Sequence, residues 1–358
     1  MVIRELSALN FRNFRELRVS FSDRINVLIG QNGQGKTNVV EAIYFLNHLD
    51  SFRTHNLGEL IAQGASLAQM QGILRTGETD QKVRVDISRR GRKVTVDDQP
   101  IPKLSAYVAA FFALVFNPDH LYLFRHVPSE RRWLLNRYLS FAEPAYLSAL
   151  REFRMVHAQK NQLLKRGELS SLPAWNQLFA ARSYAILGNR SAFAERVNPL
   201  LSEAFAMLTG RREALRLEVH ASLAGTVEQM AEALANARET EARTGHAMLG
   251  PHRDDVRLIL GDAKRDTLFS QGEYRAALLA LQLALGRMLE EERGFRPVLI
   301  LDDVFSELDA AVRERLLDYL PRLSNQMFIT TTEWTEPMPT AGARIMEIQA
   351  GRVAAVKE

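Results

Sequence analysis

A glycine-rich stretch near the start of the chain has the residue types and spacing of a phosphate-binding loop. The segment GQNGQGKT matches the pattern G-x-x-x-x-G-K-[ST] at every fixed position, and Asn38 follows it. Its residues are Gly30, Gln31, Asn32, Gly33, Gln34, Gly35, Lys36 and Thr37. Glycines let backbone N–H groups turn inward around a phosphate, the lysine reaches the β- and γ-phosphates, and the threonine hydroxyl ligates Mg²⁺. The loop predicts a nucleotide site with Mg²⁺.

The flanking sequence supports this interpretation against a chance glycine-rich turn. Ile25, Val27 and Ile29 alternate before the loop, as in a buried strand. After the loop, apolar residues recur at helical spacing from Val39 to Leu49. Strand, loop and helix in this order are the context that the motif requires.

A second set of candidate residues lies near the other end of the chain. The apolar segment Val298–Leu301 reads as a buried strand, and it ends in Asp302 and Asp303. Asp302 suits the Mg²⁺ site, partly through water, together with Thr37, and Asp303 suits a base that positions the attacking water. The alternative is that both carboxylates only cap a helix after a core strand. Because this strand is so distant from the loop, we expect a large insertion between them.

A third candidate segment precedes this strand. Ser270, Gln271, Gly272 and Glu273 form a capping-box pattern before a long, mostly apolar helical sequence. A simple helix cap is one interpretation. The other is that a hydroxyl, a flexible backbone and the positive end of a helix dipole together bind a γ-phosphate.

Composition sets broad limits on the protein. With 358 residues, of which 46% are hydrophobic and 25% charged, the chain resembles an ordinary globular protein. No apolar run is long enough for a transmembrane helix, so we expect no membrane partner. The absence of cysteine excludes disulfides and thiolate metal sites and fits a cytoplasmic protein. A net charge of +4 permits a polyanionic partner without demonstrating one.

The remaining sequence divides into a strand-rich and a helical part. Alternation over residues 83–87 and 94–96, around the turn Arg89-Arg90-Gly91-Arg92, predicts a hairpin whose basic tip either contacts DNA or is simply solvated. Arg12 and Asn13, between two phenylalanines, are candidates for adenine or phosphate contacts. From 128 to 245 the period is helical, with breaks predicted at Pro128, Pro144, Pro173, Pro199 and Gly210.

Two features of the middle of the chain leave alternatives open. Cations near the predicted helix ends make this part either a DNA- and partner-binding arm or a scaffold: Lys160, Lys165, Arg166, Arg211 and Arg212. The segment Gly250–Asp255 (GPHRDD) groups a histidine with two carboxylates. Neighbouring residues of a strand point to opposite faces, which is poor spacing for metal ligands. The segment is therefore interpreted as a structural network that positions the Ser270 helix, rather than as a metal site.

Taken together, these motifs resemble those of ABC-type ATPase heads: phosphate loop, signature at Ser270–Glu273, acidic strand, and D-loop at Ser306–Asp309. Within this superfamily the chain resembles the RecF family, which is close to the SMC-type heads. The segments that carry this resemblance are LSALNFRNF, SFRTHNLGELI, VFNPDHLYLF with PSERRWLLN, and GPHRDD. They are distributed along nearly the whole chain. The resemblance implies an α/β P-loop ATPase lobe of residues 1–127 plus 246–358 and an inserted helical lobe of residues 128–245, with no long coiled coil.

The resemblance also implies a function. RecF-like proteins are slow, DNA-stimulated ATPases that dimerise around ATP and act in gap repair and the SOS response. They help RecO and RecR to direct RecA onto single-stranded DNA at double-strand junctions. By this resemblance Lys36, Gln271 and Asp303 serve hydrolysis, Ser270, Gln271 and Gly272 meet the γ-phosphate of the opposite subunit, and Thr330–Thr332 is the polar sensor. Asp303 departs from the glutamate of most heads, which suggests slow hydrolysis.

Two other functions are alternatives to this one. A transporter-type ATPase subunit should carry an LSGGQ-like signature, whereas this chain has SQGE. A nucleotide-gated DNA scaffold without hydrolysis should lack phosphate-facing residues, yet all of them are present.

Overall fold

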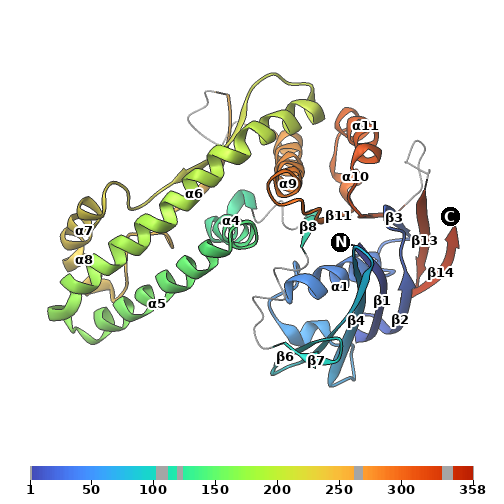
Figure 1. Cartoon of the computed structure of the whole chain (residues 1–358), viewed down its shortest axis with the longest axis horizontal. Coiled ribbons are helices and arrows are strands. Elements are labelled where there is room, and N and C mark those ends of the chain that lie inside the picture. The colour runs from blue at the N-terminus through green and yellow to red at the C-terminus, as the bar shows by residue number, and fades with distance from the viewer. Residues whose placement is uncertain (1, 102–111, 119–123, 262–268, 333–341, 358) are drawn as a thin grey trace. The chain divides into compact units, whose positions relative to one another are not determined.

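The chain folds into two compact units, and the first is built from both ends of the sequence (Figure 1). The computed structural model describes residues 2–101, 112–118, 124–261, 269–332 and 342–357. Unit 1 comprises Met1–Leu121, Met207–Gly210 and Ser270–Glu358, and unit 2 comprises Tyr122–Ala206 and Arg211–Phe269. The predicted insertion, 128–245, ends earlier than unit 2. The reason is that β10 (Asp255–Leu260) pairs antiparallel with β9 (Leu215–His220) and so belongs to the inserted unit.

Unit 1 contains two six-stranded sheets. The antiparallel sheet has the order β2-β1-β4-β5-β6-β7, and the predicted hairpin over residues 83–96 is its β5–β6 pair. Its strands are β1 (Val2–Phe11), β2 (Phe14–Ser20), β4 (Leu67–Thr76), β5 (Thr79–Ser88), β6 (Gly91–Val96) and β7 (Gln99–Pro100). Alternate residues of these strands are buried, as expected for a sheet with one face on a core.

The second sheet is mainly parallel and has the order β14-β13-β3-β12-β11-β8. Its strands are β3 (Ile25–Ile29), β8 (Ala113–Phe116), β11 (Val298–Asp302), β12 (Met327–Thr331), β13 (Ala343–Gln349) and the antiparallel edge strand β14 (Arg352–Lys357). Strands β8, β11 and β12 are buried along their whole length, which explains their continuous apolar sequence.

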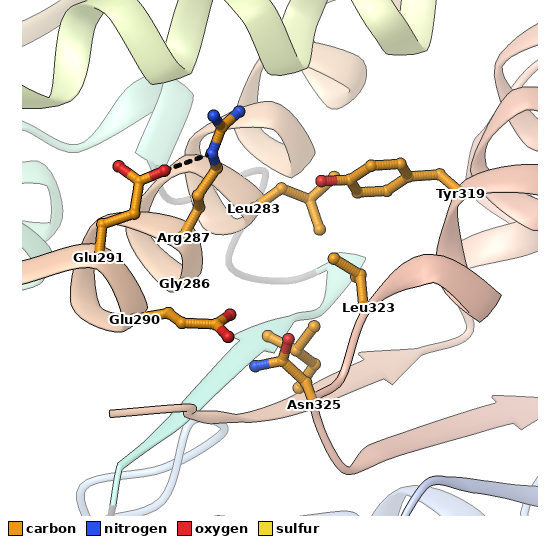
Figure 2. Close-up of a pocket in the computed structure, with 9 residues that line it drawn as sticks. Leu283, Gly286, Arg287, Glu290, Glu291, Tyr319, Leu323 and Asn325 are labelled. Atoms are coloured by element: carbon orange, nitrogen blue, oxygen red, sulfur yellow. Dashed lines mark hydrogen bonds and ion pairs between the residues drawn. The ribbon is translucent and has the colours of Figure 1, made fainter. Parts of the chain in front are cut away.

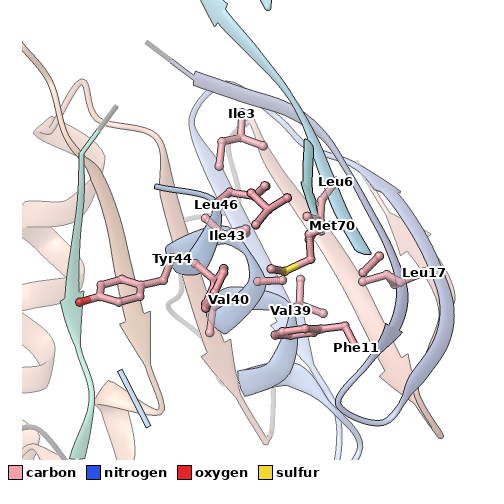
Figure 3. Close-up of a cluster of buried hydrophobic side chains, with 14 of the residues drawn as sticks. Ile3, Leu6, Phe11, Leu17, Val39, Val40, Ile43, Tyr44, Leu46 and Met70 are labelled. Atoms are coloured by element: carbon pink, nitrogen blue, oxygen red, sulfur yellow. The ribbon is translucent and has the colours of Figure 1, made fainter. Parts of the chain in front are cut away.

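Helix α1 (Lys36–His48) packs on both sheets and closes the core between them. Figure 3 shows Val39, Val40, Ile43 and Leu46 of this helix among side chains of β1, β2 and β4. The core residues of the antiparallel sheet drawn there are Ile3, Leu6, Phe11, Leu17 and Met70. Since α1 begins at the phosphate loop, burial of this helix fixes the loop's position.

Most of the other described helices of unit 1 lie in the second half of the chain. Helix α9 (Gln271–Arg293) is buried along most of its length, as the sequence predicted. Among the described residues, the remaining helical elements of this unit are η1 (Leu57–Leu60), α10 (Val304–Glu307), α11 (Ala310–Tyr319) and η4 (Leu320–Arg322).

Unit 2 is mostly helical. Its elements are α4 (Pro128–Ala142), α5 (Pro144–Arg166), η2 (Leu169–Ser171), α6 (Leu172–Thr209), α7 (Val227–Asn236), α8 (Arg238–Thr244) and the β9–β10 pair. Helices α5 and α6 run side by side (Figure 1), and the rings of Phe153 and Phe179 join them at 5.3 Å. The two-stranded sheet was not predicted, because its strands are separated in sequence.

The predicted break at Pro199 is wrong, because this residue lies inside α6. Val197, Leu201 and Phe205 are fully buried on either side of it, so one apolar face continues through the proline. By contrast, Pro128 and Pro144 do begin helices. Within the described residues, no helix combines the length and apolar character needed to cross a bilayer.

Candidate nucleotide site

The candidate site lies where parallel strands of unit 1 end. Strands β3, β12, β11 and β8 are neighbours and run in the same direction, so their carboxyl ends meet at one edge of the sheet. The phosphate loop follows β3, and Asp302 is the last residue of β11. Ligands of such sheets bind beyond the carboxyl ends of the strands.

The glycines of the loop are required by close approaches and by backbone angles. A Cβ atom at Gly30 would lie 2.3 Å from the carbonyl oxygen of Ile348. Gly33 and Gly35 have φ angles of 79° and 112°, which side chains rarely adopt. At Gly35 a Cβ atom would also lie 2.8 Å from Nδ2 of Asn13. The pattern of glycines is therefore explained by the shape of the loop.

Lys36 lies under the loop, with only 7% of its surface exposed. Its Nζ donates to the carbonyl oxygens of Gly30, at 2.5 Å, and Gln31, at 3.0 Å. Burial lowers the pKa of Lys36, and the nearby charges of Asp303 and Asp302 oppose this effect. The ammonium group is thus held by neutral oxygens and keeps its charge available for phosphates.

Asp302 and Thr37 meet although they are distant in sequence. Thr37 Oγ1 donates to Oδ1 of Asp302 at 3.0 Å. Adjacent oxygen ligands of an octahedral Mg²⁺, each about 2.1 Å from the ion, are about 3.0 Å apart. Thr37 and Asp302 are hard oxygen donors and would hold Mg²⁺ here, where the ion would supply positive charge to a bound phosphate.

Two further side chains hold Asp302, and one of them was not predicted. Thr330, within the proposed sensor segment, donates to Oδ1 at 2.7 Å, and Asn117 donates to Oδ2 at 2.7 Å. Asn117 follows the short apolar strand β8, just as Asp302 ends β11, and this shared pattern could have identified it. Asp302 is 2% exposed, and burial raises its pKa although three side chains donate to it.

Asp303 precedes α10 as its N-cap residue with a φ angle of 51°, and its N–H donates to Oγ1 of Thr330 at 2.9 Å. Thr330 therefore connects the two adjacent aspartates. Asp303 is only partly buried and acts electrostatically on Lys36. These contacts place Asp303 at the site, and its role in positioning water stays a prediction.

Two distant turns hold the phosphate loop from outside. Asn13 Nδ2 donates to the Gln34 carbonyl at 3.3 Å, and Asn13 Oδ1 accepts from Asn38 at 2.7 Å. From the β13–β14 turn, the N–H groups of Ala350 and Gly351 donate to Gln34 at 2.6 and 3.1 Å. This second contact was not predicted, because nothing local in the sequence links residues so far apart.

Arg12 lies next to Asn13 but faces a different partner. Its guanidinium forms a two-point ion pair with the fully buried Glu41 of α1, at 2.5 and 2.8 Å. Ser51 and Arg53 also contact this carboxylate. Arg12 therefore joins the β1–β2 turn to α1, and its predicted contact with the nucleotide stays a prediction.

The Ser270 segment forms the predicted capping box at the start of α9. Ser270 Oγ accepts from the Glu273 N–H at 3.2 Å, and the Glu273 carboxylate accepts from the Ser270 N–H at 2.7 Å. Ser270 and Gln271 are exposed and Gly272 is half-buried. In the part of the chain that the structure describes, no hydrogen bond or ion pair joins this segment to the phosphate loop. It lies instead beside the D-loop, because Arg275 bonds to the carbonyl oxygen of Glu307 at 3.0 Å.

The segment Gly250–Asp255 belongs to a charged network inside unit 2. Asp254 pairs with the buried Arg190 at 2.7 Å and accepts from Ser222, and Asp255 pairs with Arg131 at 2.8 Å. The ring of His252 stacks on His157 at 4.1 Å, and burial lowers the pKa of His252 to about 4. The network is internal to this unit, and its predicted effect on α9 is not tested.

One predicted cation of the helical arm is internal as well. Lys160 is fully buried and pairs with Glu241 at 2.8 Å. It therefore cannot contact DNA without unfolding its surroundings. Lys165, Arg166, Arg211 and Arg212 are exposed.

A separate pocket of about 330 Å³ opens in unit 1 (Figure 2). Leu283, Gly286, Leu299 and Leu323 give it an apolar lining, and its rim carries the ion pair between Arg287 and Glu291. Leu299 is near the amino end of β11, whereas Asp302 is at the carboxyl end. The pocket is thus at the opposite edge of the sheet from the candidate site.

Comparisons with known proteins agree with the motifs. Residues 2–353 match the family model of the RecF/RecN/SMC N-terminal domain. The DNA replication and repair protein RecF of Geobacter sulfurreducens is 34% identical over 330 residues, which are 90% of this chain and 90% of that protein. RecF of Geotalea daltonii is 30% identical over 93% of each chain. The chain belongs to the RecF family.

Solved structures confirm the RecF fold. The recombination mediator protein RecF with ATP has a TM-score of 0.88 and 25% identity, covering 99% of this chain and 98% of that one. An Smc head bound to the C-terminal winged-helix domain of ScpA has a TM-score of 0.60 at 17% identity, so it shows the shared head fold alone. The predicted fold, an ABC-type ATPase head with an inserted helical part and no long coiled coil, is confirmed.

Proposed function

We propose that this RecF-family protein is an ATP-controlled DNA-binding protein of recombinational gap repair. The observation that carries the proposal is the convergence of Lys36, Thr37 and Asp302 at one edge of the parallel sheet, where a hydroxyl and a carboxylate provide the oxygen ligands that Mg²⁺ prefers. The relatives' names, DNA replication and repair protein RecF, and the solved RecF–ATP structure support both parts of the proposal.

Hydrolysis is proposed to be slow and stimulated by DNA. Asp303 would position the attacking water, Lys36 would stabilise charge on the phosphates, and Gln271 would act from a second subunit. An aspartate carries its carboxylate one methylene closer to the backbone than the glutamate of most ABC-type heads. The group therefore stands farther from the water, which favours a switch over a motor.

ATP is proposed to form part of a homodimer interface. The segment Ser270–Gly272, whose Ser270 and Gln271 are exposed, presents a helix N-terminus and a hydroxyl, which bind anions well. From the resemblance to ABC-type heads, we assign it to the γ-phosphate on the partner subunit. ADP lacks this phosphate, so hydrolysis would weaken the dimer.

Two substitutions test the dimer in opposite directions. Ser270→Arg should leave ATP binding by the monomer intact and prevent dimerisation, since its bulk crowds the shared site. Asp303→Asn should keep the ATP contacts and accumulate a long-lived dimer. Light scattering with ATP and Mg²⁺, and with ADP as the control, measures both. A wild type equally dimeric with ADP, or a Ser270→Arg protein that dimerises normally, contradicts the proposal.

The biological step is proposed to be assistance to RecA loading at junctions of single- and double-stranded DNA, together with RecO- and RecR-type partners. The solved relative is described as a recombination mediator of the RecFOR pathway. Binding to duplex, single-stranded and gapped DNA with and without ATP is the direct test. A preference for gapped DNA that depends on ATP supports the proposal. If the protein binds no DNA with or without ATP, the transporter-type ATPase subunit is the better interpretation. If the protein binds DNA equally well with and without ATP, the interpretation as a DNA scaffold without hydrolysis is favoured.

A further inference from the structure

The β5–β6 hairpin ends in a short, well-defined turn. Ser88 pairs with Gly91, so Arg89 and Arg90 alone form the loop. The Ser88 hydroxyl donates to the Gly91 carbonyl at 3.1 Å and accepts from the Arg90 N–H at 3.3 Å. A Cβ atom at Gly58 of η1 would lie 3.8 Å from Cγ of Arg89, so the turn also rests on its neighbour. The two arginines are therefore displayed by an ordered backbone.

The cations of this turn lack carboxylate partners. Arg89, Arg90, Arg92 and Lys93 are all exposed. Within the described ranges none of them forms an ion pair. Strand alternation places Arg92 on the same face as the buried Val94, and Arg92 acts on Asp50, whereas Lys93 faces outward. We therefore define the basic turn as Arg89, Arg90 and Lys93.

The opposite end of the same strands has the reverse character. There Arg75 pairs with Asp80 at 2.6 Å, and Lys82 pairs with Asp98 at 3.1 Å. Asp97 adds a third carboxylate at this end. Cations at one end of the hairpin are thus neutralised by ion pairs. At the other end Lys93 is opposite Asp86 in the register, but Arg89 and Arg90 of the loop form no described ion pair. Such a cluster raises the energy of the free protein slightly and is relieved by an anionic partner.

Strand register places the basic turn at the nucleotide edge of the sheet. Ser88 pairs with Leu67 of β4, and Gln69 of β4 pairs with Leu9 of β1. The turn after β5 is therefore at the same edge as the β1–β2 turn, whose Asn13 holds the phosphate loop. Two to three strand spacings, roughly 10–14 Å, separate the two turns.

We infer that the basic turn contacts the phosphate backbone of bound DNA beside the nucleotide. The inference rests on the proposed DNA-binding function and extends it to named residues of unit 1. Lys36 already serves the phosphates of ATP, and the basic turn is too distant to reach the same groups. Guanidinium groups bind phosphate oxygens in a two-point geometry, which suits Arg89 and Arg90. These contacts do not read sequence.

A pair of charge-reversal variants tests this inference. Arg89→Glu with Arg90→Glu changes the net charge by four units, and Arg18→Glu with Lys357→Glu makes the same change at exposed positions elsewhere in unit 1. With ATP present, the turn variant should lose about tenfold or more in DNA affinity, and its slope of log K against log salt should fall by about 2. The control should change affinity by less than about twofold, and both variants should bind ATP like wild type.

The cysteine-free chain allows a direct second measurement. Arg90→Cys and Lys357→Cys each provide one labelling site for a photo-crosslinker. Crosslinking to DNA with ATP should occur at position 90 and be nearly absent at 357. If wild type binds DNA while the turn variant keeps its affinity and salt slope, or position 90 fails to crosslink, the inference is wrong and the proposed function stands. If wild type binds no DNA, both fail.

Discussion

The buried charges at the candidate nucleotide site of unit 1 have different partners from the buried charges of unit 2. In unit 2, Arg190 is 1% exposed and pairs with Asp254, and Lys160 pairs with Glu241. In unit 1, Asp302 accepts only from hydroxyl and amide groups, and Lys36 donates to backbone carbonyls. The first arrangement neutralises charge inside the protein. The second satisfies hydrogen bonds with neutral groups, and Lys36 and the two aspartates act on one another only through space.

This difference separates structural from functional charges. A buried ion pair is self-contained, so removing one partner exposes the other to an apolar interior and costs stability. A buried charge held by neutral groups costs stability as it stands and is compensated when a ligand of opposite charge binds. The comparison predicts opposite effects of substitution at the candidate site and at the ion pairs of unit 2.

The largest expected effect is on the stability of unit 2. Arg190→Met leaves the carboxylate of Asp254 buried without its cation and should cost about 3–5 kcal/mol in the free energy of unfolding. Arg190 also donates to Asn136, Tyr146 and the Pro251 carbonyl, and these bonds are lost with it. Urea unfolding followed by tryptophan fluorescence measures the change. In a Trp334→Phe background, the remaining tryptophans, Trp133 and Trp175, both belong to unit 2.

The matched control is Arg196→Met on the same helix, where a partly exposed arginine pairs with Glu143. Exposed pairs contribute about 0–1 kcal/mol, so this variant should remain close to wild type. Combining Arg190→Met with Asp254→Leu should recover part of the loss, because no charge is then left unpaired. Equal stability of the two single variants would contradict the structural assignment.

The next effect concerns ligand binding in unit 1. Lys36→Met should weaken ATP binding by about a hundredfold or more, because charged hydrogen bonds to two phosphates are lost. The unfolding free energy without nucleotide should change by less than about 1 kcal/mol, since only two backbone carbonyls lose a donor. Calorimetric titration with ATP and urea unfolding give the two values. Unchanged affinity for ATP would remove the phosphate-loop assignment.

The sequence predicted the parts of this site that are defined locally. The phosphate loop is specified by its own glycines, and Asp302 by the apolar strand before it. The capping box at Ser270 is likewise complete within four residues. Each of these depends on neighbours in the chain, so the pattern of residue types is sufficient.

Partners chosen by tertiary packing were not predicted. Asn117 reaches Asp302 only because β8 and β11 pair, and Ala350 reaches Gln34 only because β13 lies beside β3. Arg12 was assigned to the nucleotide, but its ion pair is with Glu41, a carboxylate that the helical pattern of α1 does not distinguish. Lys160 looked like a surface cation for the same reason, because its partner is on a different helix.

The smallest predicted effect is a gain in stability when the buried Asp302 is replaced, whereas most substitutions of buried residues lower stability. Burial raises the folded-state pKa of Asp302 above its unfolded value, so the folded protein binds the proton more tightly. The associated stabilisation is complete below the unfolded pKa and is lost as pH rises through the folded pKa. At pH 7 without ligand, Asp302 therefore lowers stability. Asp302→Asn should raise the unfolding free energy by on the order of 1 kcal/mol, because Asn117 can turn its amide to accept from the new one.

The gain should shrink as pH falls through the raised pKa of the wild-type carboxyl, and calorimetric unfolding in EDTA from pH 4 to 8 measures it. Asp318→Asn, an exposed residue of α11, makes the same charge change and should show no comparable trend. Adding Mg²⁺ and ATP at a hundred times the dissociation constant stabilises wild type by about 2.7 kcal/mol. The Asn variant should lose most of the Mg²⁺-dependent part, because its amide is a poor ligand for the ion. If Asp302→Asn is less stable than wild type without ligand, Asp302 stabilises the fold as the buried ion pairs of unit 2 do, and the prediction is wrong.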